Sequence, residues 1–259
     1  MTTHASTRTS SGLLRVEWVC LIALIVAIAL AVLGPVIGQP AAYHGFADTR
    51  ALGVVPNAWN VLSNLAFVVA GLAIGLGLTR APARRLSRAT QSALFVTAAG
   101  LLFTAAGSAY YHAMPDDAAL FWDRMPMTIA FAGIIGAALA QRVTPRAGTV
   151  AAIVLLLLGP ASLIYWRTSG NLTPYVVLQG AAMAALLALV LLTRARGDAL
   201  PWWWVIVWYA VAKAAELFDV GIFDVTGGFV SGHTLKHLFA AVAAGALAYP
   251  LWNRKTGSV

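Results

Sequence analysis

Two histidines stand four residues apart in the stretch SGHTLKH at residues 231–237, just before an apolar run from Leu238 to Trp252. On a helix, residues i and i+4 lie on one face, so the imidazoles of His233 and His237 can bind the same metal ion. Polar groups inside a membrane are costly unless they are paired or functional. The alternative is a pair of interfacial histidines that face water, and the spacing alone does not decide between the two.

Three further residues belong to the same chemistry. His112 ends the third apolar run of the chain, Ser108 precedes it by one helical turn, and Asp123 lies just inside the fourth run. Three histidines with an open fourth position form the ligand set of a catalytic zinc site. A nearby carboxylate can take the proton of an attacking water, and a serine hydroxyl can donate to a developing oxyanion.

Each of these residues alone has a simpler explanation. An isolated His112 is typical of a residue at the membrane interface, and Asp123 could form an ion pair with Arg124 or Lys236. The combination favours a site, because three different helices supply it together.

The composition indicates an integral membrane protein. Of the 259 residues, 60% are hydrophobic and 10% are charged, whereas a soluble domain has about 25% charged residues. The net charge of +8 is not the signature of a nucleic-acid-binding protein, because the basic residues lie in loops between apolar runs. The single cysteine, Cys20, excludes an intrachain disulfide and an all-cysteine zinc site, so a metal site must use histidines and carboxylates.

The apolar runs predict an all-α, polytopic transmembrane bundle of eight helices. The expected spans are Trp18–Gly38, Ala58–Leu78, Ala89–His112, Ala118–Leu139, Gly148–Tyr165, Tyr175–Leu192, Trp202–Phe218 and the helix that begins at the histidine pair. Residues 1–14 are expected to form a disordered cytoplasmic tail, residues 15–38 an extra N-terminal helix, and residues 57–252 one seven-helix domain. The first apolar run could instead belong to a signal peptide. The run is longer than the 7–15-residue apolar core of a signal peptide, which favours a retained helix.

The distribution of basic residues predicts the orientation. With the N-terminus in the cytoplasm, the cytoplasmic segments hold twelve lysines and arginines: Arg8, Arg15, Arg80, Arg84, Arg85, Arg88, Arg142, Arg146, Arg194, Arg196, Arg254 and Lys255. The opposite loops hold only Arg50 and Arg167. We therefore expect both termini to be cytoplasmic and the three histidines to lie at the other side. The low charge and Ala-rich helices indicate a bacterial inner membrane, with the site toward the periplasm.

Three asparagines stand near the start of the second apolar run. Asn57, Asn60 and Asn64 share one helical face and are expected to look into the bundle. Hydrogen bonding between helices is the simplest role for such side chains.

Four stretches together resemble the motifs of a known family. They are NAWNVLSNL at 57–65, GSAYYH at 107–112, WDRMPM at 122–127 and SGHTLKH at 231–237. These resemble alkaline ceramidases and, more broadly, the seven-helix hydrolase superfamily that also holds the adiponectin and progestin receptors. The resemblance covers residues 57–252, which it identifies as a ceramidase-like hydrolase domain.

The resemblance implies a function and a role for each site residue. His112, His233 and His237 would bind zinc, Asp123 would hold and deprotonate the water, and Ser108 would assist the oxyanion. The family hydrolyses the amide of ceramides to a sphingoid base and a fatty acid. The expected partner is thus a lipid drawn from the bilayer and not a nucleic acid, and the sequence does not predict an oligomeric state.

The chain departs from the family in three respects. Animal members have an acidic calcium site near the first core helix, whereas this chain offers Asp48 and Asn57 without an acidic cluster, so calcium is not predicted. They also tend to carry an acidic residue after the motif aspartate, where this chain has Arg124. The helix at 15–38 lies outside the family's seven helices.

Two other function classes remain open. One is a receptor-like or sensory protein of the same superfamily, with structural zinc and little turnover. The other is a transporter that uses Lys213, Glu216 and Asp219 as a buried ionic path. Lys213 and Glu216 stand at i and i+3, so mutual neutralisation is the simpler reading of that pair. The inverted repeat typical of many transporters is not visible in the sequence.

Overall fold

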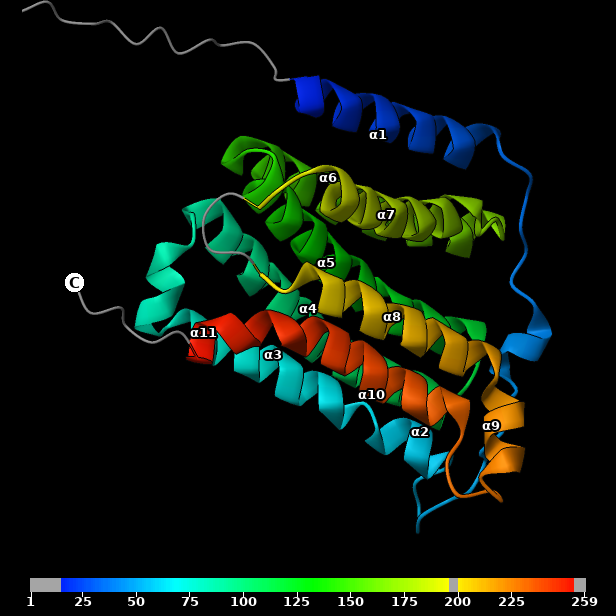
Figure 1. Cartoon of the computed structure of the whole chain (residues 1–259). Coiled ribbons are helices and arrows are strands. Elements are labelled where there is room, and N and C mark those ends of the chain that lie inside the picture. Colours follow the sequence, from blue (N-terminus) through cyan, green and yellow to red (C-terminus); the bar gives the residue numbers. More distant parts are fainter. Residues whose placement is uncertain (1–14, 196–199, 254–259) are drawn as a thin grey trace, which may run out of the picture.

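A computed structural model describes residues 15–195 and 200–253 of the chain, and the described part is a bundle of helices (Figure 1). The expected tail at residues 1–14 lies outside the described residues. In chain order, with 3₁₀-helices labelled η, the elements are α1 (Arg15–Leu33), η1 (Ala41–His44), α2 (Ala58–Leu62), α3 (Leu65–Leu78), η2 (Ala81–Arg85), α4 (Arg88–Ala113), α5 (Asp117–Arg142), α6 (Pro145–Ser169), α7 (Thr173–Leu192), α8 (Trp202–Leu217), α9 (Asp219–Val225), α10 (Gly232–Gly245), η3 (Ala246–Ala248) and α11 (Tyr249–Asn253).

The described residues contain seven helical segments that are long and apolar enough to cross a membrane. They cover residues 15–33, 58–78, 88–113, 117–142, 145–169, 173–192 and 232–253. The prediction of an all-α membrane bundle is therefore confirmed. The count of eight crossings is not confirmed, because α8 has only 16 residues, fewer than the roughly 20 that a perpendicular crossing needs.

The first helix is shorter and more peripheral than the expected segment 15–38. It ends at Leu33, because the following Gly34-Pro35 pair disfavours continuation of a helix. None of its residues is buried, and it packs beside α7 at the edge of the bundle (Figure 1). The chain then runs from residue 34 to residue 57 as a largely non-helical connector.

The second expected span is interrupted between α2 and α3. The side chains of Ser63 and Asn64 donate to the backbone carbonyl of Asn60, at 3.1 Å and 2.8 Å, and so compete with the regular helical hydrogen bonds. Asn60 and Asn64 are buried, as predicted. Asn57 instead precedes the helix with a positive φ of 46°, and its side chain donates to the carbonyl of His112 at 2.8 Å.

Small residues allow the helices that carry the site to approach closely. A Cβ atom at Gly100 would lie 2.4 Å from the backbone nitrogen of Ala130, which brings α4 against α5. A Cβ atom at Gly232 would lie 2.1 Å from the carbonyl oxygen of Ala215, which brings the start of α10 against α8. Helices α8, α10 and α3 lie side by side in Figure 1.

Candidate metal centre

The three predicted histidines meet at one end of the bundle. His112 lies in the last turn of α4, while His233 and His237 occupy the first two turns of α10. One ring nitrogen from each residue lies within 4.8 Å of those from the other two, and all three side chains are buried. The alternative of interfacial histidines that face water is therefore wrong.

The spacing of the ring nitrogens fits a metal ion. The Nε2 atom of His112 lies 3.2 Å from that of His237 and 3.3 Å from that of His233. Two nitrogens bound at 2.0–2.1 Å to a tetrahedral ion are separated by about 3.3–3.4 Å. Facing lone pairs at this distance repel unless a proton or a cation lies between them. The described chain therefore holds a buried histidine triad that could bind a metal ion.

A serine from the interrupted span orients one of the ligands. The Oγ atom of Ser63 lies 2.7 Å from Nδ1 of His237 and donates its own proton to the carbonyl of Asn60. His237 therefore donates from Nδ1 to Ser63, which leaves the Nε2 lone pair directed at the other two histidines. The break between α2 and α3 thus positions a group that supports the triad.

The start of α10 is held by hydrogen bonds from two directions. The hydroxyl of Ser231 caps the helix by accepting from the backbone nitrogen of Thr234 at 3.1 Å. Asn60 Oδ1 accepts from the Thr234 hydroxyl at 3.0 Å. Asp219 accepts from the backbone nitrogens of His233 at 2.7 Å and Ala47 at 3.1 Å, so its carboxylate ties α10 to the connector.

The connector covers the triad on one side. The ring of Phe46 lies 4.8 Å from the ring of His112 and 4.9 Å from that of His233, measured between centroids. Two residues later, the buried Asp48 carboxylate accepts two hydrogen bonds from the Arg50 guanidinium, at 2.8 Å and 2.6 Å. These bonds lower the pKa of Asp48 below its usual value, although burial opposes the shift.

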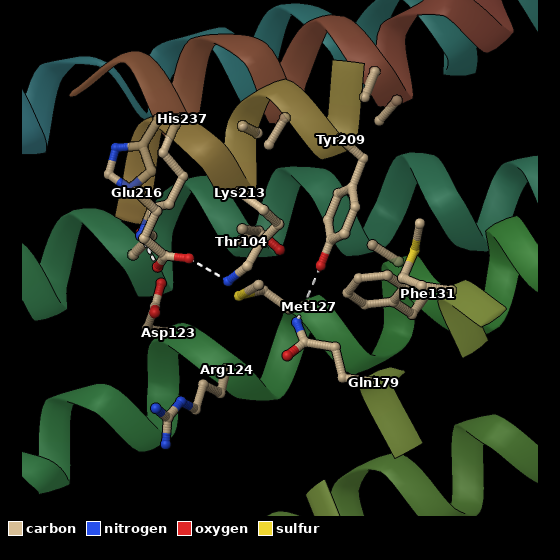
Figure 2. A pocket seen from close by; sticks show the side chains of 18 of the residues that line it. Thr104, Asp123, Arg124, Met127, Phe131, Gln179, Tyr209, Lys213, Glu216 and His237 are labelled. Atoms are coloured by element: carbon tan, nitrogen blue, oxygen red, sulfur yellow. Dashed lines mark hydrogen bonds and ion pairs between the residues drawn. The ribbon is translucent and has the colours of Figure 1, made fainter. Parts of the chain in front are cut away.

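A cavity of 340 Å³ opens on the other side of the triad, between α4, α5, α7, α8 and α10. Ser108, Asp123 and His237 all line it, so the serine hydroxyl and the carboxylate share one cavity with a histidine of the triad. Figure 2 shows Asp123, Glu216 and His237 at one end of this cavity, with Tyr209 and Phe131 toward the other. The structure therefore brings the five predicted site residues together, and the catalytic roles of Ser108 and Asp123 stay predictions.

An ionic network lies between the triad and the cavity. Lys236 Nζ lies 2.9 Å from Nε2 of His233 and 3.1 Å from Glu216 Oε1, and Lys213 forms an ion pair with the second oxygen of Glu216. The mutual neutralisation of Lys213 and Glu216 is thus confirmed. Among the described residues, neither Arg124 nor Lys236 forms an ion pair with Asp123, so the simpler explanation of that carboxylate does not hold.

Sequence reasoning missed three residues that shape the site. Phe46 carries no sequence signal, because it lies in an irregular connector far from the motifs. The role of Ser63 could have been suspected from the polar residues that interrupt an apolar run. The sequence suggests Lys236 only as a partner of Asp123, whereas it lies one helical turn after His233 and contacts His233 and Glu216.

Comparisons with known proteins identify no family for this chain. A scan against protein-family models found no match, and a search of curated proteins found none either. The structure itself describes a helical membrane protein with seven candidate spans in its described part and a buried three-histidine cluster.

Proposed function

We propose that this protein is a zinc-dependent intramembrane amide hydrolase that acts on a ceramide-like N-acyl lipid. It would release a sphingoid-type base and a fatty acid. The observation that carries the proposal is the convergence of three buried imidazole nitrogens beside a cavity that also presents a carboxylate and a serine hydroxyl. The four motifs that resemble alkaline ceramidases favour an amide as the scissile bond.

The donor set favours zinc over other common ions. Three neutral imidazoles in a buried site suit Zn²⁺, whereas Ca²⁺ and Mg²⁺ prefer oxygen ligands. When bound, a zinc ion polarises the substrate carbonyl and lowers the pKa of a water to about 7.

The side chains of the chain supply the remaining chemistry. Asp123 accepts a proton from the water whose oxygen attacks the amide carbon, and returns it to the nitrogen as the C–N bond breaks. Ser108 donates a hydrogen bond to the carbonyl oxygen as that oxygen gains negative charge. The products are a carboxylate and an amine. Both residues line the cavity and are buried, which keeps bulk water from the reaction.

The apolar part of the cavity suits an acyl chain. Beyond Asp123, the lining residues are predominantly hydrophobic: Leu101, Met127, Phe131, Ile134, Met183, Leu186, Val205 and Ala244. A volume of 340 Å³ falls within the range of small-molecule sites. A substrate from the bilayer can therefore place its chain in the hydrophobic part and its amide at the triad.

The ion pairs argue against the transporter alternative. Glu216 holds Lys213 and Lys236 at once, and Asp219 is engaged with two backbone nitrogens. These acidic groups therefore serve the local structure around α10. A receptor-like protein with a structural metal differs from the proposal only in turnover, which an assay decides.

The decisive experiment measures products and metal on the same purified samples. The full-length protein in detergent is incubated with an N-acyl sphingoid lipid, and the released base and fatty acid are quantified by mass spectrometry. We expect turnover together with near-stoichiometric zinc, and loss of both in His233→Ala/His237→Ala. Bound zinc without any amide hydrolysis would contradict the enzymatic proposal and favour the receptor-like alternative.

The proposal includes an orientation in a bacterial inner membrane, with both termini cytoplasmic and the triad toward the periplasm. Reporter fusions after Arg84 and Asn171 should lie on opposite sides, because α4, α5 and α6 separate them. Fusions after Arg194 and Gly227 test whether α8 forms an eighth crossing. If the fusions after Arg194 and Gly227 lie on the same side of the membrane, α8 does not cross it and the number of crossings is seven.

A further inference from the structure

A buried arginine lies next to the proposed general base. Arg124 follows Asp123 on α5, is only 6% exposed and lines the cavity. Its guanidinium carbon lies 5.0 Å from the ring centroid of Tyr43, 5.1 Å from that of Trp166 and 5.3 Å from that of Tyr175. Aromatic rings from the connector, α6 and α7 therefore hold the cation in one position.

Most hydrogen-bonding groups of this arginine have no protein partner. Nη1 donates to Oε1 of Gln39 at 2.8 Å, and within residues 15–195 and 200–253 neither Nε nor Nη2 makes a hydrogen bond. These two nitrogens are not among the fully buried atoms that lack a partner, so each keeps some accessible surface. A guanidinium has five N–H donors in a planar fork, and the free ones are available to a ligand.

The cavity is lined by one more basic than acidic side chain. Three basic side chains line it, Arg124, Lys213 and Lys236, while its acidic side chains are Asp123 and Glu216. Glu216 is already paired with both lysines, and in the described chain no carboxylate lies within ion-pair distance of Arg124. A buried cation without an ion-pair partner is costly, and the excess of basic side chains favours an anionic ligand.

The position of Arg124 indicates which part of a lipid it would contact. Along α5, the cavity-lining residues beyond Asp123 are Met127, Ala130, Phe131 and Ile134, which lead away from the polar end. In Figure 2, Arg124 lies at the end of the cavity that holds Asp123. With the acyl chain in the hydrophobic part and the amide at Asp123, the amine portion of the substrate would face the guanidinium.

We infer that Arg124 forms an anion-binding subsite, and that the substrate is an N-acyl lipid whose amine portion carries a carboxylate or a phosphate. A phosphorylated sphingoid amine and an amino acid both meet this description. Both groups match the guanidinium fork with two parallel hydrogen bonds. The assignment of the amide and the acyl chain rests on the proposed function, whereas the anion subsite rests on the surroundings of Arg124.

Equilibrium binding tests this subsite without any turnover. The ligands are ketone analogues in which CH₂ replaces the amide nitrogen, so that they cannot be cleaved. They share one acyl chain and end in a hydroxyl, a carboxylate or a phosphate. We expect at least one anionic analogue to bind the full-length protein about tenfold or more tightly than the neutral analogue. The carboxylate and phosphate ligands then distinguish the two head-group chemistries.

Substitutions assign the preference to Arg124. Arg124→Gln should abolish the preference for anionic over neutral analogues, while the affinity for the neutral analogue stays nearly unchanged. Arg124→Lys should reduce the preference, because the planar fork is lost. Arg167→Gln, which changes an exposed arginine outside the cavity, should keep it. If Arg124→Gln fails to fold, the lysine variant decides, and an unreduced preference in that variant overturns the inference.

Two other outcomes would also overturn the inference. One is equal affinity of the wild-type protein for all three analogues. The other concerns free fatty acid, measured as a fourth ligand. If its affinity alone depended on Arg124, this residue would be a contact of the released product. Because no step requires hydrolysis, a protein without amidase activity can still pass this test, and an active amidase can fail it.

Discussion

Helices α1 and α10 are both apolar segments that the sequence predicted to cross the membrane, yet they have different environments. Segment 15–33 has the highest mean hydropathy of the seven candidate spans and buries none of its residues. Segment 232–253 shares the lowest mean hydropathy with α5, and its first turns are buried among polar partners. In this bundle, the helices with polar interruptions are those that carry the site.

The strongest test of this contrast removes two ligands from α10. The double substitution His233→Ala/His237→Ala should reduce zinc from near-stoichiometric to background and eliminate turnover, since one histidine cannot retain the ion. Elemental analysis of the purified protein provides the measurement. Ile25→Ala in α1, at a side chain that is 57% exposed, should change neither property. Full zinc in the double variant would exclude the triad as the metal site.

The next test separates catalysis from metal binding. Asp123→Asn keeps the shape of the side chain but removes the base, so turnover should fall by about 10²–10⁴-fold. Ser108→Ala should lower turnover by about 10²–10³-fold if its hydroxyl stabilises the oxyanion. Zinc measured on the same samples should be retained in both variants. Loss of zinc from Asp123→Asn would make this carboxylate part of the coordination instead.

A smaller effect is expected at the residue that orients His237. Ser63→Ala removes the acceptor for Nδ1 and should weaken zinc affinity by about 10–100-fold, as is usual when a partner of a ligand is lost. Competition with a chelator measures the affinity. Ser162→Ala is a matched control, because in the described part of the chain this buried serine bonds only to the carbonyl of Gly159 within its own helix. Equal affinities of the two variants would show that Ser63 is dispensable.

The smallest effect concerns the connector. The pKa of Asp48 is lowered by Arg50, so the ion pair contributes stability above the unfolded pKa of about 4, and this contribution is lost as the pH falls through the lower folded value. Asp48→Asn should therefore lower the melting temperature at neutral pH. The difference from wild type should narrow below about pH 4. A difference that is constant with pH would contradict an ionic origin.

The sequence predicted those parts of the site that depend on residue type and spacing. The H-x-x-x-H pair, His112, Ser108 and Asp123 could be identified because helical periodicity and the alternation of spans bring them to one end of the bundle. The sequence predicts the bounds of four candidate spans to within a few residues, namely 88–113, 117–142, 145–169 and 173–192. Apolar length alone was sufficient for these.

Other features depend on contacts that no local pattern encodes. Phe46 covers the histidines only because the connector folds back over the end of the bundle. Among the described residues Arg124 has no carboxylate partner, because Gln39 and three aromatic rings surround its guanidinium. Pro35 is a local signal for the end of α1 at Leu33. The expected segment extends past this proline, because it follows the apolar run to Gly38.

The covering position of Phe46 has a consequence for metal exchange. A hydrated ion does not readily cross the hydrophobic part of the cavity, so the route to the triad from water leads past the connector. On this side, departure of a bound ion would require Phe46 to move aside. The protein would therefore release its metal at a rate set by this local opening, and dialysis against a chelator would remove the ion slowly even when the chelator binds it more tightly.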